Sequence, residues 1–99
     1  MGKAKLVYHS KLIYPDGAIR EMIIWQLPSK TPDRPHGLKY RLYYGNEKGD
    51  CLVRYDNESG KGDHRHIKGK EEPYKFTNVE KSVEDFQKDI DKFRRRRKK

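Results

Sequence analysis

The chain has little cysteine and no long apolar segment, and each scarcity excludes a class of protein. Its single cysteine, Cys51, cannot form an internal disulfide, which favours a reducing compartment such as the cytoplasm. The longest apolar run covers residues 22–25, whereas a membrane helix needs roughly 20 apolar residues. Only 32% of the 99 residues are hydrophobic, which allows one small core. We therefore expect a single cytoplasmic domain with no membrane contact.

Basic charge is what the chain has in excess. The formal net charge is +9, and 39% of the residues are charged. Residues 1–70 carry a net +6, residues 71–93 a net −3, and residues 94–99 are all basic. The domain, which we place at residues 1–93, stays cationic without residues 94–99, which we expect to form a flexible basic tail. Nucleic acid is the commonest partner of such a surface.

The first half of the chain reads as strands. Apolar residues alternate over residues 5–14 and recur over residues 18–27, and Pro15, Asp16 and Gly17 between them favour a hairpin turn. In the second run, apolar residues occupy both odd- and even-numbered positions, which point to opposite faces of a strand. This predicts an inner strand that is covered on both faces. Residues 38–44 alternate cleanly and predict a third strand that turns Lys39, Arg41 and Tyr43 outward.

The second half adds fewer elements. A fourth strand is expected at residues 51–56, and a brief fifth strand at residues 74–76. Thr77 and Glu80 have capping-box spacing. A helical apolar stripe follows, at Val79, Val83, Phe86, Ile90 and Phe93. The expected fold class is α+β, an antiparallel sheet of four to five strands packed against one C-terminal amphipathic helix.

Residues 60–66 concentrate groups that can do chemistry. Between and after two loop glycines stand a carboxylate, two imidazoles and two cations: Gly60, Lys61, Gly62, Asp63, His64, Arg65 and His66. If a strand continues here, His64 and His66 share a face, and one can act as base and the other as acid. Such a pair can cleave RNA by activating the 2′-hydroxyl, with Lys61 and Arg65 binding phosphate and Asp63 orienting an imidazole. The plainer interpretation is a polar surface loop.

A metal site is the competing chemical interpretation of the same residues. Asp63, His64 and His66 are acceptable ligands for Zn²⁺ or Mn²⁺, but the usual paired ligand spacing is missing. We therefore expect neither a metal nor another cofactor.

Further RNA contacts are expected outside this cluster. Lys39, Arg41 and Arg54 are candidate phosphate-binding residues, and Tyr43 and Tyr55 are candidates for base stacking. The alternative for the tyrosines is packing within the core, because a thin sheet uses alternating aromatic residues in that way.

Several segments together resemble the TumE family of toxins from prokaryotic toxin–antitoxin pairs. They are Tyr55-Asp56-Asn57, then Gly60-Lys61-Gly62-Asp63-His64, then Glu72-Pro73-Tyr74 and Phe76, with Asp16-Gly17, the strand around Trp25, Lys39-Tyr40-Arg41-Leu42 and the closing helix. The resemblance implies a cytosolic toxin that arrests growth and is neutralised by a cognate antitoxin, usually a helix-turn-helix protein. Small basic toxins of this size also invite comparison with the RelE type, which cuts messenger RNA on the ribosome, so a RelE-like arrangement is a further expectation.

Together these features predict a toxin that acts on RNA, as a metal-independent endoribonuclease. Two alternatives stay open. One is a non-enzymatic module that binds nucleic acid or the ribosome, and the other is a metal-dependent nuclease.

Overall fold

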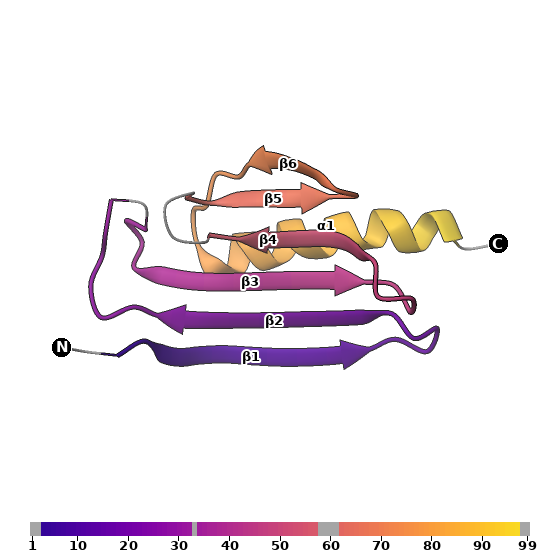
Figure 1. Ribbon diagram of the computed structural model, residues 1–99, viewed down its shortest axis with the longest axis horizontal. Coiled ribbons are helices and arrows are strands. Elements are labelled where there is room, and N and C mark those ends of the chain that lie inside the picture. Colours follow the sequence, from indigo (N-terminus) through magenta and orange to yellow (C-terminus); the bar gives the residue numbers. More distant parts are fainter. Residues whose placement is uncertain (1–2, 33, 58–61, 98–99) are drawn as a thin grey trace.

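The computed structural model describes residues 3–32, 34–57 and 62–97 and consists of one sheet and one helix (Figure 1). The elements are β1 (Lys5–Ile13), β2 (Ile19–Gln26), β3 (Leu38–Gly45), β4 (Cys51–Asp56), β5 (His64–Ile67), β6 (Lys70–Pro73) and α1 (Val79–Arg97). The six strands lie in chain order, and each runs antiparallel to the next. The α+β prediction is confirmed, with six strands instead of four to five.

The additional strands come from a hairpin that contains the histidines. The prediction of a strand at residues 74–76 is wrong, because the chain there has no regular structure between β6 and α1. Instead β5 and β6 pair across the two-residue turn Lys68-Gly69, whose φ angles are 52° and 83°. Positive φ at both central positions is the geometry of a type I′ hairpin turn. His64 and His66 therefore lie on a strand, with the fixed alternation that a strand imposes.

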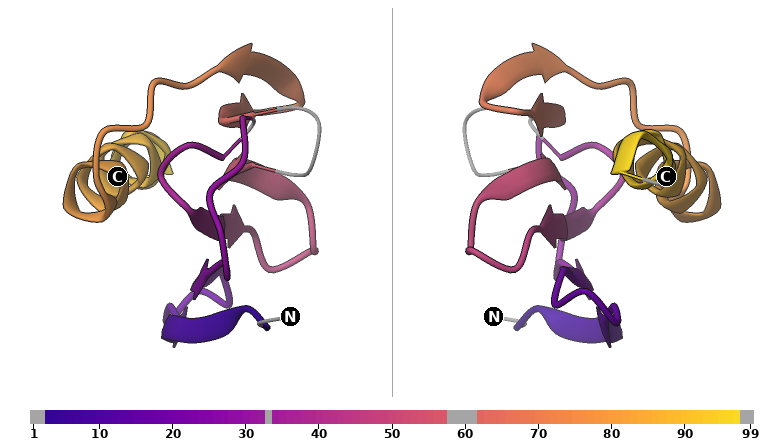
Figure 2. Two further views of the ribbon diagram at one scale, coloured as in Figure 1. Left: turned by 90° about the vertical axis from the view of Figure 1, so that its left-hand side faces the viewer. Right: turned by 90° about the vertical axis from the view of Figure 1, so that its right-hand side faces the viewer.

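Helix α1 covers one face of the sheet (Figure 2). Phe86 and Ile90 of α1 are fully buried, and Val79, Val83 and Phe93 pack beside them, which confirms the predicted stripe. The alternation predicted for β3 is also confirmed. Its helix-facing residues Tyr40, Leu42 and Tyr44 are buried, and Lys39 and Arg41 are exposed. The rest of the core comes from β2 and β4 and from one residue just before β2: Met22, Ile24, Val53, Tyr55 and Ala18.

Strand β2 is covered on one face only, which corrects the prediction of an inner strand covered on both. Met22 and Ile24 are buried beside β3, whereas Ile23 and Trp25 point to the opposite face and are partly exposed. The described chain has one helix, and that helix lies on the side of Met22 and Ile24. The apolar side chains of Ile23 and Trp25 therefore lie on a face of β2 that this helix does not cover.

Both ends of α1 differ from the sequence expectation. Asn78 caps the helix, because its Oδ1 accepts the backbone N–H of Lys81 at 2.7 Å, so the capping box at Thr77 was placed one residue too early. The helix continues through Arg97, so residue 93 lies inside it and does not mark its end. Arg94 donates to the Tyr44 hydroxyl at 2.9 Å and contacts Asp16 at 3.2 Å.

The two edges of the sheet differ in character. Edge strand β6 is short and carries Lys, Glu and Pro, which discourage the pairing of another strand. Strand β1 is nine residues long and exposes large apolar side chains, namely Leu6, Val7, Tyr8, Leu12 and Ile13. In the described part of the chain, no helix is both long enough and apolar enough to cross a membrane.

Candidate functional site

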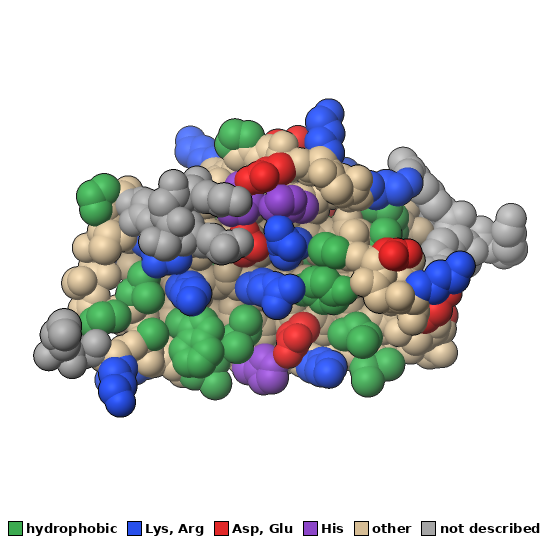
Figure 3. Space-filling view, viewed as in Figure 1, with side chains coloured by type: hydrophobic (Ala, Val, Ile, Leu, Met, Phe, Trp, Pro, Cys, Tyr) green, Lys and Arg blue, Asp and Glu red, His purple; other side chains and the backbone are tan. Residues whose placement is uncertain are grey.

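The face of the sheet away from α1, here called the outer face, brings the predicted cations and the histidines together. Directly paired residues of antiparallel strands point to the same face. One row across β3, β4 and β5 is Arg41, Asp56 and His64. The next row is Tyr43, Arg54 and His66. Figure 3 shows Lys and Arg side chains beside the histidines on this face.

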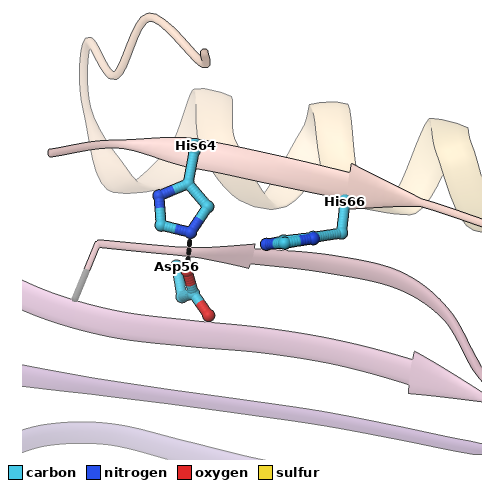
Figure 4. A group of neighbouring side chains, drawn as sticks. All are labelled: Asp56, His64 and His66. Atoms are coloured by element: carbon cyan, nitrogen blue, oxygen red, sulfur yellow. Dashed lines mark ion pairs between the residues drawn. The ribbon is translucent and has the colours of Figure 1, made fainter. Parts of the chain in front are cut away.

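A buried ion pair forms the centre of the site. His64 Nε2 lies 2.6 Å from Asp56 Oδ1, and the two residues face each other from β5 and β4 (Figure 4). Their exposed fractions are only 3% and 5%. His64 Nδ1 donates to the Gly62 carbonyl at 3.0 Å. A carboxylate oxygen and a carbonyl oxygen therefore lie beside the two ring nitrogens of His64.

The pair is close but imperfectly hydrogen-bonded. His64 Nε2, Asp56 Oδ1 and Arg54 Nε are all buried, and none has a hydrogen-bond partner of good geometry. The separations are nevertheless short, with Arg54 Nε at 2.9 Å from Asp56 Oδ2, so the contacts are ion pairs whose N–H groups point off the line to the oxygen. Buried polar groups that lack directed hydrogen bonds are rare, and they mark places where strain or function is retained.

His66 stands beside this pair and is the more accessible imidazole. Arg54 Nη2 donates to His66 Nε2 at 3.0 Å, so Nε2 carries a lone pair and the ring is neutral. Burial lowers the pKa of His66, and the positive charge of Arg54 lowers it further. The side chain of His66 is 20% exposed, and its ring centroid lies 5.1 Å from that of His64. Glu71 approaches both rings, with oxygens 3.7 Å from His64 Nε2 and 4.0 Å from His66 Nε2.

Three side chains here could hold a metal ion. Donor atoms of Asp56, His64 and His66 all lie within 4.8 Å of one another. This set differs from the sequence-based set, because Asp56 takes the place of Asp63. The guanidinium of Arg54 already contacts Asp56 and His66, so a divalent ion would have to displace a fixed positive charge.

Asp63 has a different role from the one predicted. It accepts a hydrogen bond from the Tyr40 hydroxyl at 2.7 Å and lies 3.0 Å from His36 Nε2. The backbone N–H of Leu38 donates to His36 Nδ1, so His36 carries its proton on Nε2 and donates it to Asp63. Asp63 thus ties the start of β5 to the segment before β3. It does not orient His64 or His66.

Arg65 and Tyr55 lie on the helix-facing side, which corrects two predicted RNA contacts. Side chains alternate along a strand, so Arg65 points away from His64 and His66. It binds Glu72 at 2.5 Å and Asp89 at 3.3 Å. Tyr55 is fully buried and donates to Asp89, so its ring cannot stack on a base.

The remaining predicted residues divide between the outer face and the undescribed segment. Lys39, Arg41 and Arg54 border a hollow of about 290 Å³ that also touches Asp56, near the lower limit for small-ligand sites. Tyr43 lies in the row of Arg54, and the Arg41 guanidinium is 5.4 Å from its ring centre. Gly62 has a φ of 72°, which suits glycine. Gly60 and Lys61 lie outside the described residues.

Sequence reasoning missed Asp56 and Glu71 as members of the site. Each pairs directly with a histidine across an antiparallel ladder, Asp56 with His64 and Glu71 with His66. The signal that could have found them is a strand at residues 64–67, which brings both carboxylates to the face of the imidazoles.

Comparison with known proteins gives one match. A family model described as toxin TumE matches residues 3–94. No curated protein and no solved structure matches the chain, so the RelE-like arrangement stays a prediction.

Proposed function

The chain belongs to the TumE family of toxins, and from this we propose that it acts by cleaving RNA on the outer face of its sheet. The observation that carries the proposal is the group of side chains on that face. A neutral imidazole, His66, contacts the cation Arg54, and Arg54 borders a hollow together with Arg41 and Lys39. A proton acceptor next to phosphate-binding groups is the minimum that cleavage of a phosphodiester needs.

His66 is the proposed proton acceptor. Its Nε2 lone pair is held by Arg54 at 3.0 Å. A phosphate group is a stronger acceptor for guanidinium than imidazole is, so phosphate binding draws Arg54 away and frees Nε2. The free lone pair then takes the proton of the 2′-hydroxyl, and the 2′-oxygen attacks the neighbouring phosphorus. The bond from phosphorus to the 5′-oxygen breaks, and the departing 5′-oxygen takes a proton from water.

His64 is proposed as a positioning residue. At 3% exposed it does not reach a substrate, but it contacts Asp56, which in turn contacts Arg54. This chain of ion pairs keeps Arg54 at the border of the hollow, next to His66 and within reach of a phosphate bound there. The sequence alone suggested that both rings transfer protons. The proposal assigns proton transfer to His66 alone, and the burial of His64 supports this choice.

The proposed reaction needs no metal ion. Arg54 and Arg41 supply positive charge where the pentacoordinate phosphorus becomes more negative. A metal-dependent nuclease is the alternative favoured by the cluster of Asp56, His64 and His66. A module that binds RNA or the ribosome without cleavage is favoured by the engaged state of His66 Nε2. A chelator would abolish cleavage by the metal-dependent nuclease but not the cleavage that we propose. A module that only binds RNA would give no cleavage products.

A toxin of a toxin–antitoxin pair has an antitoxin as partner. We propose a helix-turn-helix antitoxin and a cytoplasmic site of action, where RNA is reached and the free thiol of Cys51 stays reduced. Growth arrest is the expected outcome of expression without the antitoxin.

Purified protein and labelled RNA, in the presence of chelator, test the proposal. We expect cleavage by the wild-type chain and at least a 100-fold loss in His66→Ala, the usual size of a lost general base. His9→Ala is the matched control, because His9 lies on the outer face in β1 at the far side of the sheet, opposite Ile23, with its ring in contact with Glu21. Equal activity in wild type and His66→Ala would reject the assignment.

A further inference from the structure

Trp25 occupies an unusual place for the largest aromatic side chain of a small domain. It lies on the outer face of β2, directly opposite Lys39 of β3 and Leu6 of β1. It is partly exposed, and it belongs neither to the described core nor to the residues packed against it. Keeping a tryptophan ring outside the core forgoes much of the stabilisation that burial gives. The ring is therefore available to a ligand.

The surroundings of Trp25 indicate which ligand. Its cross-strand neighbour Lys39 begins the cationic hollow that continues through Arg41 to Arg54. On the same face, hydrophobic side chains lie directly beside the Lys and Arg side chains (Figure 3). An aromatic ring next to a positively charged groove is how proteins hold single-stranded nucleic acid. The cations follow the backbone, and bases stack on the ring.

We infer that Trp25 is a base-stacking platform for single-stranded RNA, set a few nucleotides from the linkage that is cleaved at His66. The inference rests on the proposed function, and it names the form of the substrate. From Trp25 to His66 the register counts four residues along the strands and three strands across the sheet. With the usual rise and strand spacing this is about 20 Å.

The geometry favours a single strand over a duplex. In a double helix each base stacks on its neighbours and presents no free face, so a tryptophan on an open sheet has nothing to stack on. A single strand can turn one base onto Trp25 while its phosphates follow Lys39, Arg41 and Arg54. Among the described residues, the one helix, α1, lies on the other side of the sheet (Figure 2).

The chain contains one tryptophan, so its fluorescence reports on this position alone. The probe is a short 2′-O-methyl oligouridylate, which cannot be cleaved through its own 2′-oxygen. We expect saturable quenching by this single strand and little quenching by inorganic polyphosphate, which brings charge without bases. Equal quenching by polyphosphate, or no quenching at saturating oligonucleotide, would overturn the inference.

Variants test the same point through affinity, measured by anisotropy of a labelled oligouridylate. Trp25→Ala is expected to bind about 10-fold more weakly, the effect of one lost stack, and Trp25→Phe to retain most of the affinity. Tyr8→Ala is the matched control, because Tyr8 is an exposed aromatic that pairs with Ile24 on the helix-facing side. Circular dichroism verifies folding. Loss of affinity that is equal in Trp25→Ala and Tyr8→Ala would contradict a specific stack.

The outcomes separate this inference from the proposed function. Cleavage by a protein whose Trp25 is not quenched rejects the platform and leaves the nuclease standing. Quenching by a protein that cleaves no RNA rejects the nuclease and supports the platform in a binding module.

Discussion

Removal of the Asp56 carboxylate should destabilise the fold strongly, because it leaves the buried Nε2 of His64 and Nε of Arg54 without the anion that faces them. Asp56 is 5% exposed and lies 2.6 Å from His64 and 2.9 Å from Arg54. Breaking a buried ion pair from one side typically costs about 3–5 kcal/mol. Two features place Asp56→Ala near the lower limit, about 3 kcal/mol. The side chain of Arg54 is 28% exposed and can turn to water, and a Glu71 oxygen already lies 3.7 Å from His64 Nε2.

Urea unfolding followed by tryptophan fluorescence and circular dichroism measures this cost. For an m value of about 1.5 kcal/mol/M, the midpoint falls by roughly 2 M. Domains of this size are stable by about 5–15 kcal/mol, so a folded baseline should remain. Glu84→Ala is the control, because it also removes a carboxylate, but from an exposed position on α1, and its loss should stay within about 0.5 kcal/mol.

A double-mutant cycle with His64→Ala decides whether the pair is the cause. If the two residues stabilise each other, the double variant loses less than the sum of the single variants, by about 1 kcal/mol or more. A cost below about 1 kcal/mol for Asp56→Ala, or additive losses in the cycle, would refute the reasoning. The short distance between Asp56 and His64 would then contribute little to the free energy of unfolding.

Four further predictions follow from the site and the residues around it. Asn57 is 1% exposed and bridges β3 by accepting from the Tyr40 N–H and donating to the Leu38 carbonyl, so Asn57→Ala should cost about 2 kcal/mol in urea unfolding; an unchanged midpoint would contradict this. Burial and then Arg54 lower the pKa of His66 below its ordinary 6.5. The loss of cleavage rate on acidification should therefore be centred below pH 6.5, and Arg54→Gln should move this loss to higher pH. The same lowered pKa means that protonation of His66 favours the unfolded chain, so this contribution to stability is present above pH 6.5 and is lost as the pH falls through the folded value. Chelator should leave wild-type cleavage unchanged, and metal-restored activity would favour the metal-dependent alternative.

The strands with clear alternation could be predicted from sequence, because burial of one face imposes a period of two. Residues 38–44 show this most clearly, and they give both the core face and the outward cations correctly. The helix follows from its apolar stripe in the same way. The burial of β2 could not be predicted in this way. Trp25 and Ile23 are apolar and suggest a second buried face, although they lie on the face away from α1.

The β5–β6 hairpin could not be found by the same means. Its strands are four residues each, and three of the β6 residues are charged. Its turn places Lys68 at a positive φ where asparagine or aspartate would have given a recognisable signal. Without this hairpin, the partners of the histidines could not be assigned. Asp63, adjacent in sequence, was chosen in place of Asp56, which pairs with His64 across the ladder.

The chemical identity of the ends of the cleaved RNA reports which oxygen attacked the phosphorus. Attack by a 2′-oxygen after proton transfer to His66 leaves a 2′,3′-cyclic phosphate on one fragment and a 5′-hydroxyl on the other. We predict these ends for RNA cut by the wild-type chain in the presence of chelator, and no such products from His66→Ala. Fragments that end in a 3′-hydroxyl and a 5′-phosphate would show that water was the nucleophile and would contradict the account.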